Sequence, residues 1–243
     1  MPVGPAGIGG RVEGLHAVAA ALAAGRVRSL TVEEGRSRRS PLADMIAAHP
    51  GVAVTVVDDV RPLAVTTAPQ GVVADCRPIA SLDLASLVGA EEVPAILAID
   101  HVEDPHNLGA MARTAMAAGV RSLVVPDRRG APLDAAAFKA AAGALEHARI
   151  AVVSSIAEAV VRLGKLGVWS VGLDAAGDRE LFGLDLLTQP VVIVVGGETG
   201  LHRLVRDRVD VVASIPMAGT AESLNASVAA SLACYELFRL RRG

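Results

Sequence analysis

Two stretches of the chain place polar residues and glycines directly after an apolar run and then continue into a segment of small residues. They are Asp100-His-Val-Glu-Asp-Pro-His-Asn-Leu-Gly-Ala-Met-Ala-Arg-Thr-Ala115 and Ser214-Ile-Pro-Met-Ala-Gly-Thr-Ala-Glu-Ser-Leu-Asn-Ala-Ser227. This order is typical of a strand, a loop and a helix. Because ligands of open α/β sheets bind outside the carboxyl ends of the strands, we expect these loops to bind ligand.

Within the first stretch, Asp104 suits the N-cap of a helix and Pro105 its first position. Asn107 then lies in the first turn, beside backbone N–H groups that have no partner inside the helix. Arg113 follows Ala and Gly three and four positions earlier, which predicts space beside its guanidinium. Taken singly, the asparagine would only cap a helix and the arginine would only be solvated. Their combination in one motif predicts a functional site.

A third polar turn, Gly196-Gly-Glu-Thr-Gly-Leu201, follows the apolar run Val191–Val195. A glycine-rich turn after a buried strand can bind phosphates. This one has neither Gly-x-Gly-x-x-Gly nor a Gly-Lys-Ser/Thr ending, which disfavours a dinucleotide fold or a P-loop. The chain also has no Gly-x-Ser-x-Gly nucleophile elbow. A doubly wound oxidoreductase or hydrolase is therefore the weaker interpretation.

The three stretches resemble the signature motifs of the SpoU (TrmH) family, whose members are S-adenosylmethionine-dependent RNA ribose 2′-O-methyltransferases. The string Asp-Pro-x-Asn-x-Gly-Ala-x-x-Arg-Thr-Ala matches the first motif, and Ile215-Pro-Met-x-Gly-x-x-x-Ser-Leu-Asn-x-Ser227 matches the third. The glycine turn resembles the second motif, Gly-x-Glu-Gly-x-Gly-Leu, with one residue missing between Glu198 and Gly200. The resemblance spans nearly the whole chain.

This resemblance implies an α/β fold with a small N-terminal RNA-binding domain and a C-terminal parallel-sheet SPOUT domain. The SPOUT domain is implied to contain a deep trefoil knot, in which the last helix passes through a loop. The implied cofactor is S-adenosylmethionine, and no metal is expected. The residues implied to act in catalysis are Asn107, Arg113, Glu198, Ser223 and Asn225. Those implied to bind the cofactor are Gly196, Gly200, Ile215, Met217 and Leu224.

In this family the arginine that matches Arg113 is commonly assigned to remove the proton of the ribose hydroxyl. Guanidinium groups hardly deprotonate in proteins. A charged Arg113 could instead stabilise the developing alkoxide and bind the neighbouring phosphate. Both roles stay open at the level of the sequence.

We expect the chain to divide into a compact α/β unit over 1–76, a linker over 77–93 and a second domain over 94–243. In the first unit we expect helices at Glu13–Ala24 and Pro41–Ala48 and strands at Val27–Val32, Val52–Val57 and Gly71–Ala74. The linker contains a short predicted helix at Ser81–Val88.

From Ala95 onward, predicted strands and helices alternate, which favours a parallel sheet with helices on both faces. The expected strands are Ala95–Ile99, Ser122–Val125, Ile150–Val153, Val168–Leu173, Val191–Val195 and Val211–Ile215. The expected helices are Pro105–Ala118, Asp134–Ala142, Ile156–Leu166, Leu201–Asp207 and Ser223–Arg241, the last with Ser223 as its N-cap.

Two stretches of the first unit, Gly14-Leu-His-Ala-Val18 and Gln70-Gly-Val-Val-Ala74, resemble the flanks of the small RNA-binding domain in the RlmB type of the family. That type methylates a guanosine ribose in 23S rRNA. The position before Gln70 is commonly His in that group and is Pro69 here. Despite this departure at Pro69, the resemblance of the two stretches makes a guanosine of 23S rRNA the favoured substrate. The alternatives are a tRNA, another rRNA, or an RNA-binding homologue without catalysis, which should have lost some of the five catalytic residues.

The net charge of −3 argues at first against an RNA partner. Five arginines nevertheless cluster in the first unit, namely Arg26, Arg28, Arg36, Arg38 and Arg39. Electrostatic footprints on RNA are local patches, so the overall charge is weak evidence. Composition alone would explain the cluster as a solvated loop, and the family resemblance favours an RNA-binding patch.

Several absences point to a cytoplasmic protein without membrane contact. The N-terminus has no basic segment followed by an apolar one. The longest uncharged stretches, Pro62–Ala74 and Ser223–Tyr235, are too short to span a bilayer. Cys76 and Cys234 do not form a disulfide framework or a zinc motif.

The last predicted helix has almost no polar side before Arg239. A helix of that kind is usually buried all round. It could lie in the core of one chain, or it could pair two chains into a homodimer through the C-terminal domain.

Overall fold

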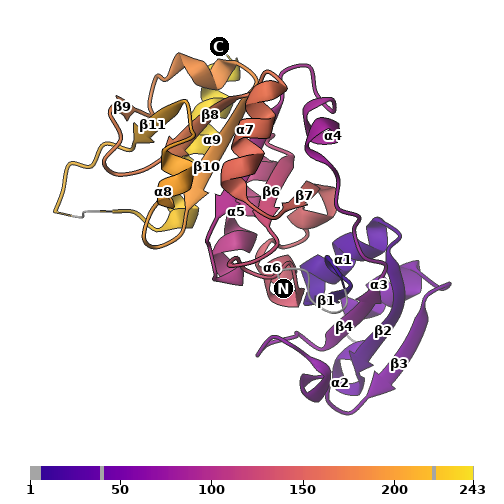
Figure 1. Ribbon diagram of the computed structural model, residues 1–243. Coiled ribbons are helices and arrows are strands. Elements are labelled where there is room, and N and C mark those ends of the chain that lie inside the picture. Colours follow the sequence, from indigo (N-terminus) through magenta and orange to yellow (C-terminus); the bar gives the residue numbers. More distant parts are fainter. Residues whose placement is uncertain (1–6, 39–40, 221–222, 243) are drawn as a thin grey trace.

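A computed structural model describes residues 7–38, 41–220 and 223–242 of the chain. Its first sheet has the strand order β1-β4-β2-β3. The strands are β1 (Arg11–Glu13), β2 (Val27–Glu33), β3 (Ala53–Val57) and β4 (Val72–Cys76), accompanied by α1 (Leu15–Ala23), α2 (Glu34–Ser37), α3 (Leu42–Ala48) and the 3-10 turn η1 (Arg61–Leu63). Strand β4 is antiparallel to β1 and β2, whereas β2 and β3 are parallel. Figure 1 shows this unit in indigo and purple.

The second sheet has the strand order β7-β6-β5-β10-β8-β11-β9, and each of its described pairings is parallel. The strands are β5 (Ala95–Asp100), β6 (Ser122–Pro126), β7 (Arg149–Val153), β8 (Trp169–Leu173), β9 (Arg179–Glu180), β10 (Val191–Gly196) and β11 (Val211–Ser214). The order places β10 between β5 and β8, although a long stretch of chain separates it from β5.

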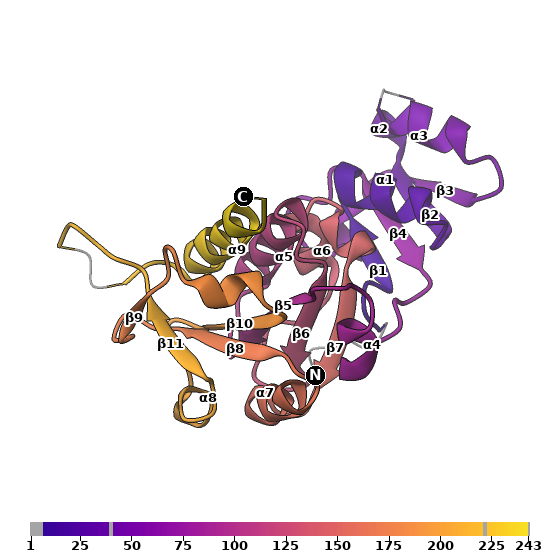
Figure 2. The ribbon, with the colours of Figure 1, turned by 90° about the horizontal axis from the view of Figure 1, so that it is seen from above.

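Helices cover both faces of this sheet (Figure 2). One face carries α5 (Pro105–Ala117), α6 (Ala135–Ala140) and α9 (Ala226–Arg242), and the other carries α4 (Leu84–Val88), α7 (Ile156–Lys165) and α8 (Arg203–Arg206). The 3-10 turns η2 (Ala144–His147) and η3 (Asp185–Thr188) complete the domain. Because side chains alternate along a strand, Leu97 and Ile193 pack towards the first set of helices, whereas Ile96 and Val192 pack towards the second.

The predicted α/β fold with a parallel sheet and helices on both faces is confirmed. Each predicted helix and strand is present, with ends that differ by a few residues. Sequence periodicity missed β1, β9, α2 and the 3-10 turns, because segments of two to four residues are too short to show a period. The trefoil knot depends on the path between β11 and α9, which includes residues outside the described ranges, and it stays a prediction.

The start of the last helix corrects one prediction. Helix α9 begins at Ala226 rather than at Ser223. Its N-cap is Asn225, whose Oδ1 accepts hydrogen bonds from Ser227 N at 2.8 Å and Ser227 Oγ at 2.6 Å. An asparagine side chain satisfies the free N–H groups of the first turn in this way, and Ser223 is left in the preceding loop.

The segment between the two sheets packs against the second domain. Leu82 N donates to Ile150 O at 2.8 Å, and Val152 N donates to Ser81 Oγ at 3.0 Å. Leu84 and Leu87 of α4 are buried in the same cluster as α7. The first sheet ends at Cys76 and the second begins at Ala95, and the domain limits at 76 and 94 stay predictions.

A buried ion pair joins the first unit to the second domain. Arg26, just before β2, donates from Nε to Glu146 Oε2 at 2.6 Å and from Nη2 to Oε1 at 2.5 Å. The side chain of Arg26 is 12% exposed and that of Glu146 is fully buried. The Arg26 guanidinium also lies 5.7 Å from the ring centre of Phe138 and donates to Gly9 O at 3.1 Å.

This pair corrects the proposed arginine patch. Arg26 is not part of an RNA-binding surface, because its charge is neutralised and covered inside the protein. Arg28, Arg36 and Arg38 are exposed, and Arg36 is 3.6 Å from Glu33. Arg39 lies outside the described residues.

Contacts inside the first unit bring its two family-like stretches together. Gln70 Oε1 accepts a hydrogen bond from Leu15 N at 2.9 Å, so that Gln70 binds the first turn of α1. The neighbouring Glu13 is fully buried and accepts from Val65 N at 2.6 Å and from Thr66 N at 3.0 Å. A buried carboxylate needs such donors, and this one fixes the loop that leads to Gln70.

Arg26→Ala should destabilise the whole protein, because it leaves the Glu146 carboxylate buried without its partner. Breaking a buried pair in this way costs about 3–5 kcal/mol. Urea unfolding should show this loss, while the exposed Arg28→Ala stays close to wild type. A loss below about 1 kcal/mol for Arg26→Ala would show that the pair does not hold the domains together.

Candidate active site

The carboxyl ends of β5 and β10 lie side by side at the centre of the second sheet. Gly196 pairs with Asp100 in the parallel register, and so the loops that follow the two strands are neighbours. The chain leaves β5 towards β6 on one side of the sheet and leaves β10 towards β11 on the other. Such a reversal of direction opens a crevice, which is where open α/β sheets bind their ligands.

Two glycines let these loops approach. A Cβ atom at Gly196 would lie 2.1 Å from the carbonyl oxygen of Gly200, and one at Gly197 would lie 2.3 Å from that of His101. Neither position can hold a side chain without moving backbone. Gly200 N donates to Gly197 O at 3.0 Å, which closes the turn in four residues. The shortened second motif therefore forms a tight turn.

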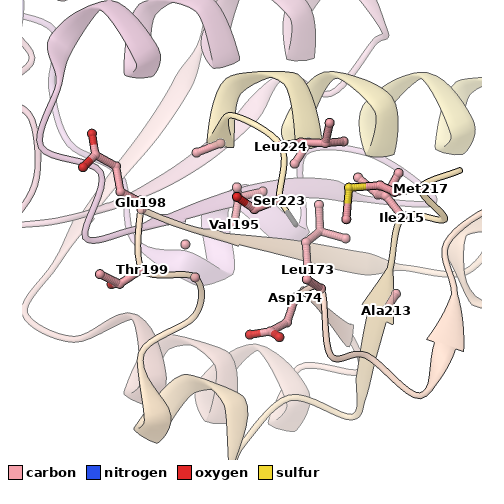
Figure 3. A pocket seen from close by; sticks show the side chains of 16 residues that line it. Leu173, Asp174, Val195, Glu198, Thr199, Ala213, Ile215, Met217, Ser223 and Leu224 are labelled. Carbon is pink, nitrogen blue, oxygen red and sulfur yellow. The ribbon is translucent and has the colours of Figure 1, made fainter. Parts of the chain in front are cut away.

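A cavity of about 360 Å³ lies behind this turn, within the usual range for small-molecule sites. All the predicted cofactor residues line it, namely Gly196, Gly200, Ile215, Met217 and Leu224. Figure 3 shows Met217 and Leu224 on one side and Leu173 and Asp174 on the other. We call it the donor cavity.

A second cavity of about 500 Å³ lies on the other side of the turn, between the loops after β5 and β10. Four of the five predicted catalytic residues line it, namely Asn107, Glu198, Ser223 and Asn225. Asn225 Nδ2 donates to Asn107 Oδ1 at 3.2 Å, which links the first and third motifs. Asp104 Oδ1 accepts from His106 N at 2.8 Å, and the predicted N-cap of α5 is thus confirmed. We call it the acceptor cavity.

The two cavities share one wall. The residues that line both are Gly197, Glu198, Thr199, Ser223, Leu224 and Ala226. In Figure 3 the Glu198 carboxylate points away from the apolar side chains of the donor cavity. Because the cavities adjoin at these residues, two ligands bound in them would lie next to each other, as a group-transfer reaction requires.

Arg113 lies apart from both cavities. It is exposed on α5 and lines a different hollow with residues that include His16, Gly143 and His147. It forms no hydrogen bond or ion pair with the described residues. The space predicted beside it is partly filled, because a Cβ at Gly109 would lie 2.5 Å from Ala137 O in α6. Gly109 therefore serves helix packing.

Sequence reasoning missed a polar cluster beside the acceptor cavity. His101 Nδ1 lies 2.7 Å from Asp100 Oδ1, and Asp100 Oδ2 accepts from His202 N at 3.3 Å. The rings of His101 and His202 stack with centroids 5.1 Å apart. Asp100 and His101 belong to the first stretch. The position of His202 depends on the pairing of β5 with β10, which the sequence does not show.

Asp174, in the donor cavity, was also missed. Its Oδ1 lies 2.8 Å from Arg206 Nη1 and accepts from Ala176 N at 2.9 Å. It follows β8, a predicted strand whose place beside β10 could not be read from the sequence.

Other chemistries find little support. Burial raises the pKa of the Cys76 thiol to about 11 and that of Cys234 to about 12, so neither is a thiolate at neutral pH. Within the described ranges, no group of three or more His, Cys, Asp or Glu residues is arranged to hold a metal ion. None of the helices in the described part of the chain is long and apolar enough to cross a bilayer.

Comparison with known proteins assigns this site to a class. Residues 94–235 match the SpoU rRNA methylase family, and residues 11–81 match a domain described as RNA 2′-O ribose methyltransferase substrate binding. The chain belongs to the SpoU rRNA methylase family. It is accordingly an RNA 2′-O-methyltransferase that uses S-adenosylmethionine, as the motifs predicted.

Individual relatives agree with this assignment. The 23S rRNA (guanosine-2′-O-)-methyltransferase RlmB of Pseudomonas aeruginosa is 39% identical over 243 residues, covering 95% of this chain and 96% of that protein. An uncharacterized tRNA/rRNA methyltransferase of Mycolicibacterium smegmatis is 44% identical over 162 residues, covering 66% and 51%. The solved SpoU methyltransferase AviRb of Streptomyces viridochromogenes, in complex with AdoMet, matches with a TM-score of 0.79 and 29% identity, covering 96% and 90%.

Gly196→Ala should weaken S-adenosylmethionine binding, because the new methyl group would collide with the Gly200 carbonyl and displace the turn. Overlaps of this kind cost about 1–3 kcal/mol, which is about 5- to 160-fold in affinity. Calorimetry measures the effect directly. Gly164→Ala, at an open position of α7, is the matched control and should bind normally. Equal affinities for the two variants would contradict the proposed cofactor site.

Proposed function

We propose that the chain methylates the ribose 2′-hydroxyl of a guanosine in 23S rRNA. The observation that carries the proposal is the shared wall between a small-molecule cavity and a second, open cavity in a chain that aligns with RlmB relatives over nearly its full length. The first unit would bind the rRNA, and the second domain would hold the reacting groups. With ribosomal RNA as its substrate, the chain would act in the cytoplasm.

The residues of the donor cavity fit S-adenosylmethionine. Apolar side chains such as Leu173, Met217 and Leu224 offer surfaces for the adenine ring, and the backbone of 196–201 and 215–224 offers polar groups for the rest of the molecule. When bound, S-adenosylmethionine supplies an electrophilic methyl group on a sulfonium. Glu198 and Ser223, on the shared wall, would orient the ribose towards that methyl group, while the linked Asn107 and Asn225 fix the far side of the acceptor cavity.

Arg113 would act through a homodimer. The exposed side chain has no partner among the described residues of its own chain and lies outside the acceptor cavity. Helices α5 and α9 pack against each other, and α9 leaves Val228 45% and Tyr235 49% exposed. We propose that a second copy covers these side chains and supplies its Arg113 to the acceptor cavity. A charged guanidinium there would bind the RNA phosphate and stabilise the developing alkoxide.

Mapping of ribose methylation tests the function. In cells that lack the gene, mass mapping of 23S rRNA should show one guanosine that loses its 2′-O-methyl group, and the wild-type gene should restore it. Arg113→Ala should not restore it, since removal of one transition-state donor costs about 100- to 1000-fold in rate. Arg121→Ala, at another exposed arginine, should restore it fully. Loss of a methyl group from tRNA or another rRNA instead would replace the proposed substrate.

Arg113→Lys separates the two roles of the arginine. A stabilising charge predicts residual methylation by the lysine variant, although lysine lacks the bidentate geometry. If the lysine variant is as inactive as Arg113→Ala while it binds cofactor and RNA normally, the electrostatic role is wrong.

Val228→Asp should convert the proposed dimer to a monomer, because it places a charge in the apolar face of α9. Light scattering on wild type should give about twice the chain mass of 24.8 kDa. Val161→Asp, on the exposed side of α7 and 41% exposed, is the control and should stay dimeric. A fully active wild-type monomer at micromolar concentration would refute the dimer.

A further inference from the structure

The Asp100–His101 pair has the arrangement of an oriented base. The Asp100 carboxylate is 2% exposed and can only accept a hydrogen bond when ionised. With His101 Nδ1 at 2.7 Å, the imidazole must carry its proton on Nδ1, which leaves the Nε2 lone pair free to accept another. Stacking on His202 fixes the plane of the ring.

The position of His101 suits a substrate hydroxyl. It lines the acceptor cavity together with Asn107 and Asn225, and its side chain remains 35% exposed. Its carbonyl oxygen packs against Gly197, so the residue is held against the wall that both cavities share. The imidazole is therefore both oriented and reachable.

The backbone at His101 is in a conformation that side chains rarely adopt. Its φ is +53°, in the left-handed region that glycine occupies without cost. Strain of this kind persists where the surrounding structure enforces it, commonly at functional sites. Glycine would relieve the strain, and yet the chain has a histidine with a dedicated carboxylate partner.

We propose that His101 is the proton acceptor of the methyl transfer, with Asp100 as its positioning residue. This inference rests on the proposed function. As the ribose 2′-oxygen forms its bond to the methyl carbon, the carbon–sulfur bond breaks and its electron pair stays on sulfur. The hydroxyl proton passes to Nε2 of His101, and Asp100 stabilises the resulting imidazolium. In this scheme Arg113 keeps the electrostatic role, in which it binds the RNA phosphate and stabilises the developing alkoxide.

His101→Gly with chemical rescue is the test. The variant should fold, since its backbone suits glycine, and it should bind S-adenosylmethionine as wild type does. Single-turnover methylation of an rRNA fragment should fall about 100-fold or more, and added imidazole should restore part of it. His106→Ala, an exposed histidine of α5 outside both cavities, should keep wild-type activity and show no response to imidazole.

A second readout does not depend on activity. Nitrogen NMR of the wild-type protein should show the neutral His101 imidazole as the Nδ1–H tautomer. An Nε2–H tautomer, or a His101→Gly variant that methylates at the wild-type rate, would overturn the proposal. If wild type methylates no RNA at all, the proposed function fails instead, and the tautomer still reports on the Asp100–His101 pair.

Discussion

The contact between the backbone turn after β10 and the loop after β5 is the constraint on which the site depends. Gly196 and Gly197 allow the turn to close on Gly200 and to lie against His101 without any side chain between them. Because the turn and the loop lie so close, the same residues line both the donor cavity and the acceptor cavity. A larger residue at either glycine would collide with backbone atoms of Gly200 or His101 and displace this wall.

Direct contacts between side chains and backbone also join the two domains. The Arg26–Glu146 pair, the packing of Phe138 against Gly9 and the hydrogen bonds of Ser81 and Leu82 tie the first unit and the linker to the second domain. A continuous apolar core also runs through both. RNA bound to the first unit would therefore be presented at a defined position relative to the acceptor cavity.

Local signals in the sequence predicted much of this structure. The alternation of apolar runs and small-residue helices predicted the parallel sheet, and the Asp104-Pro105 pair predicted the start of α5. The start of α9 was predicted at Ser223, because both Ser223 and Asn225 are good N-caps and only the hydrogen bond to Ser227 distinguishes them. Of the ten site residues that the motif resemblance implied, nine line the two cavities in the structure, and Arg113 does not.

Long-range contacts could not be predicted. Strand order decides that β10 lies beside β5 and β8, and this order brings Asp174 and His202 to the site. The composition of the arginine cluster likewise gave no sign that Arg26 turns inward to Glu146. The contacts of Arg26 with Glu146 and of His202 with Asp100 join residues more than a hundred positions apart, which local periodicity does not link.

A structure of the protein with S-adenosylhomocysteine and a short rRNA fragment tests the central claim most directly. The account predicts the sulfur atom at the shared wall, beside Glu198 and Ser223, with a ribose 2′-hydroxyl facing it from the acceptor cavity. A sulfur atom directed towards Asp174, with the ribose outside the acceptor cavity, would contradict it.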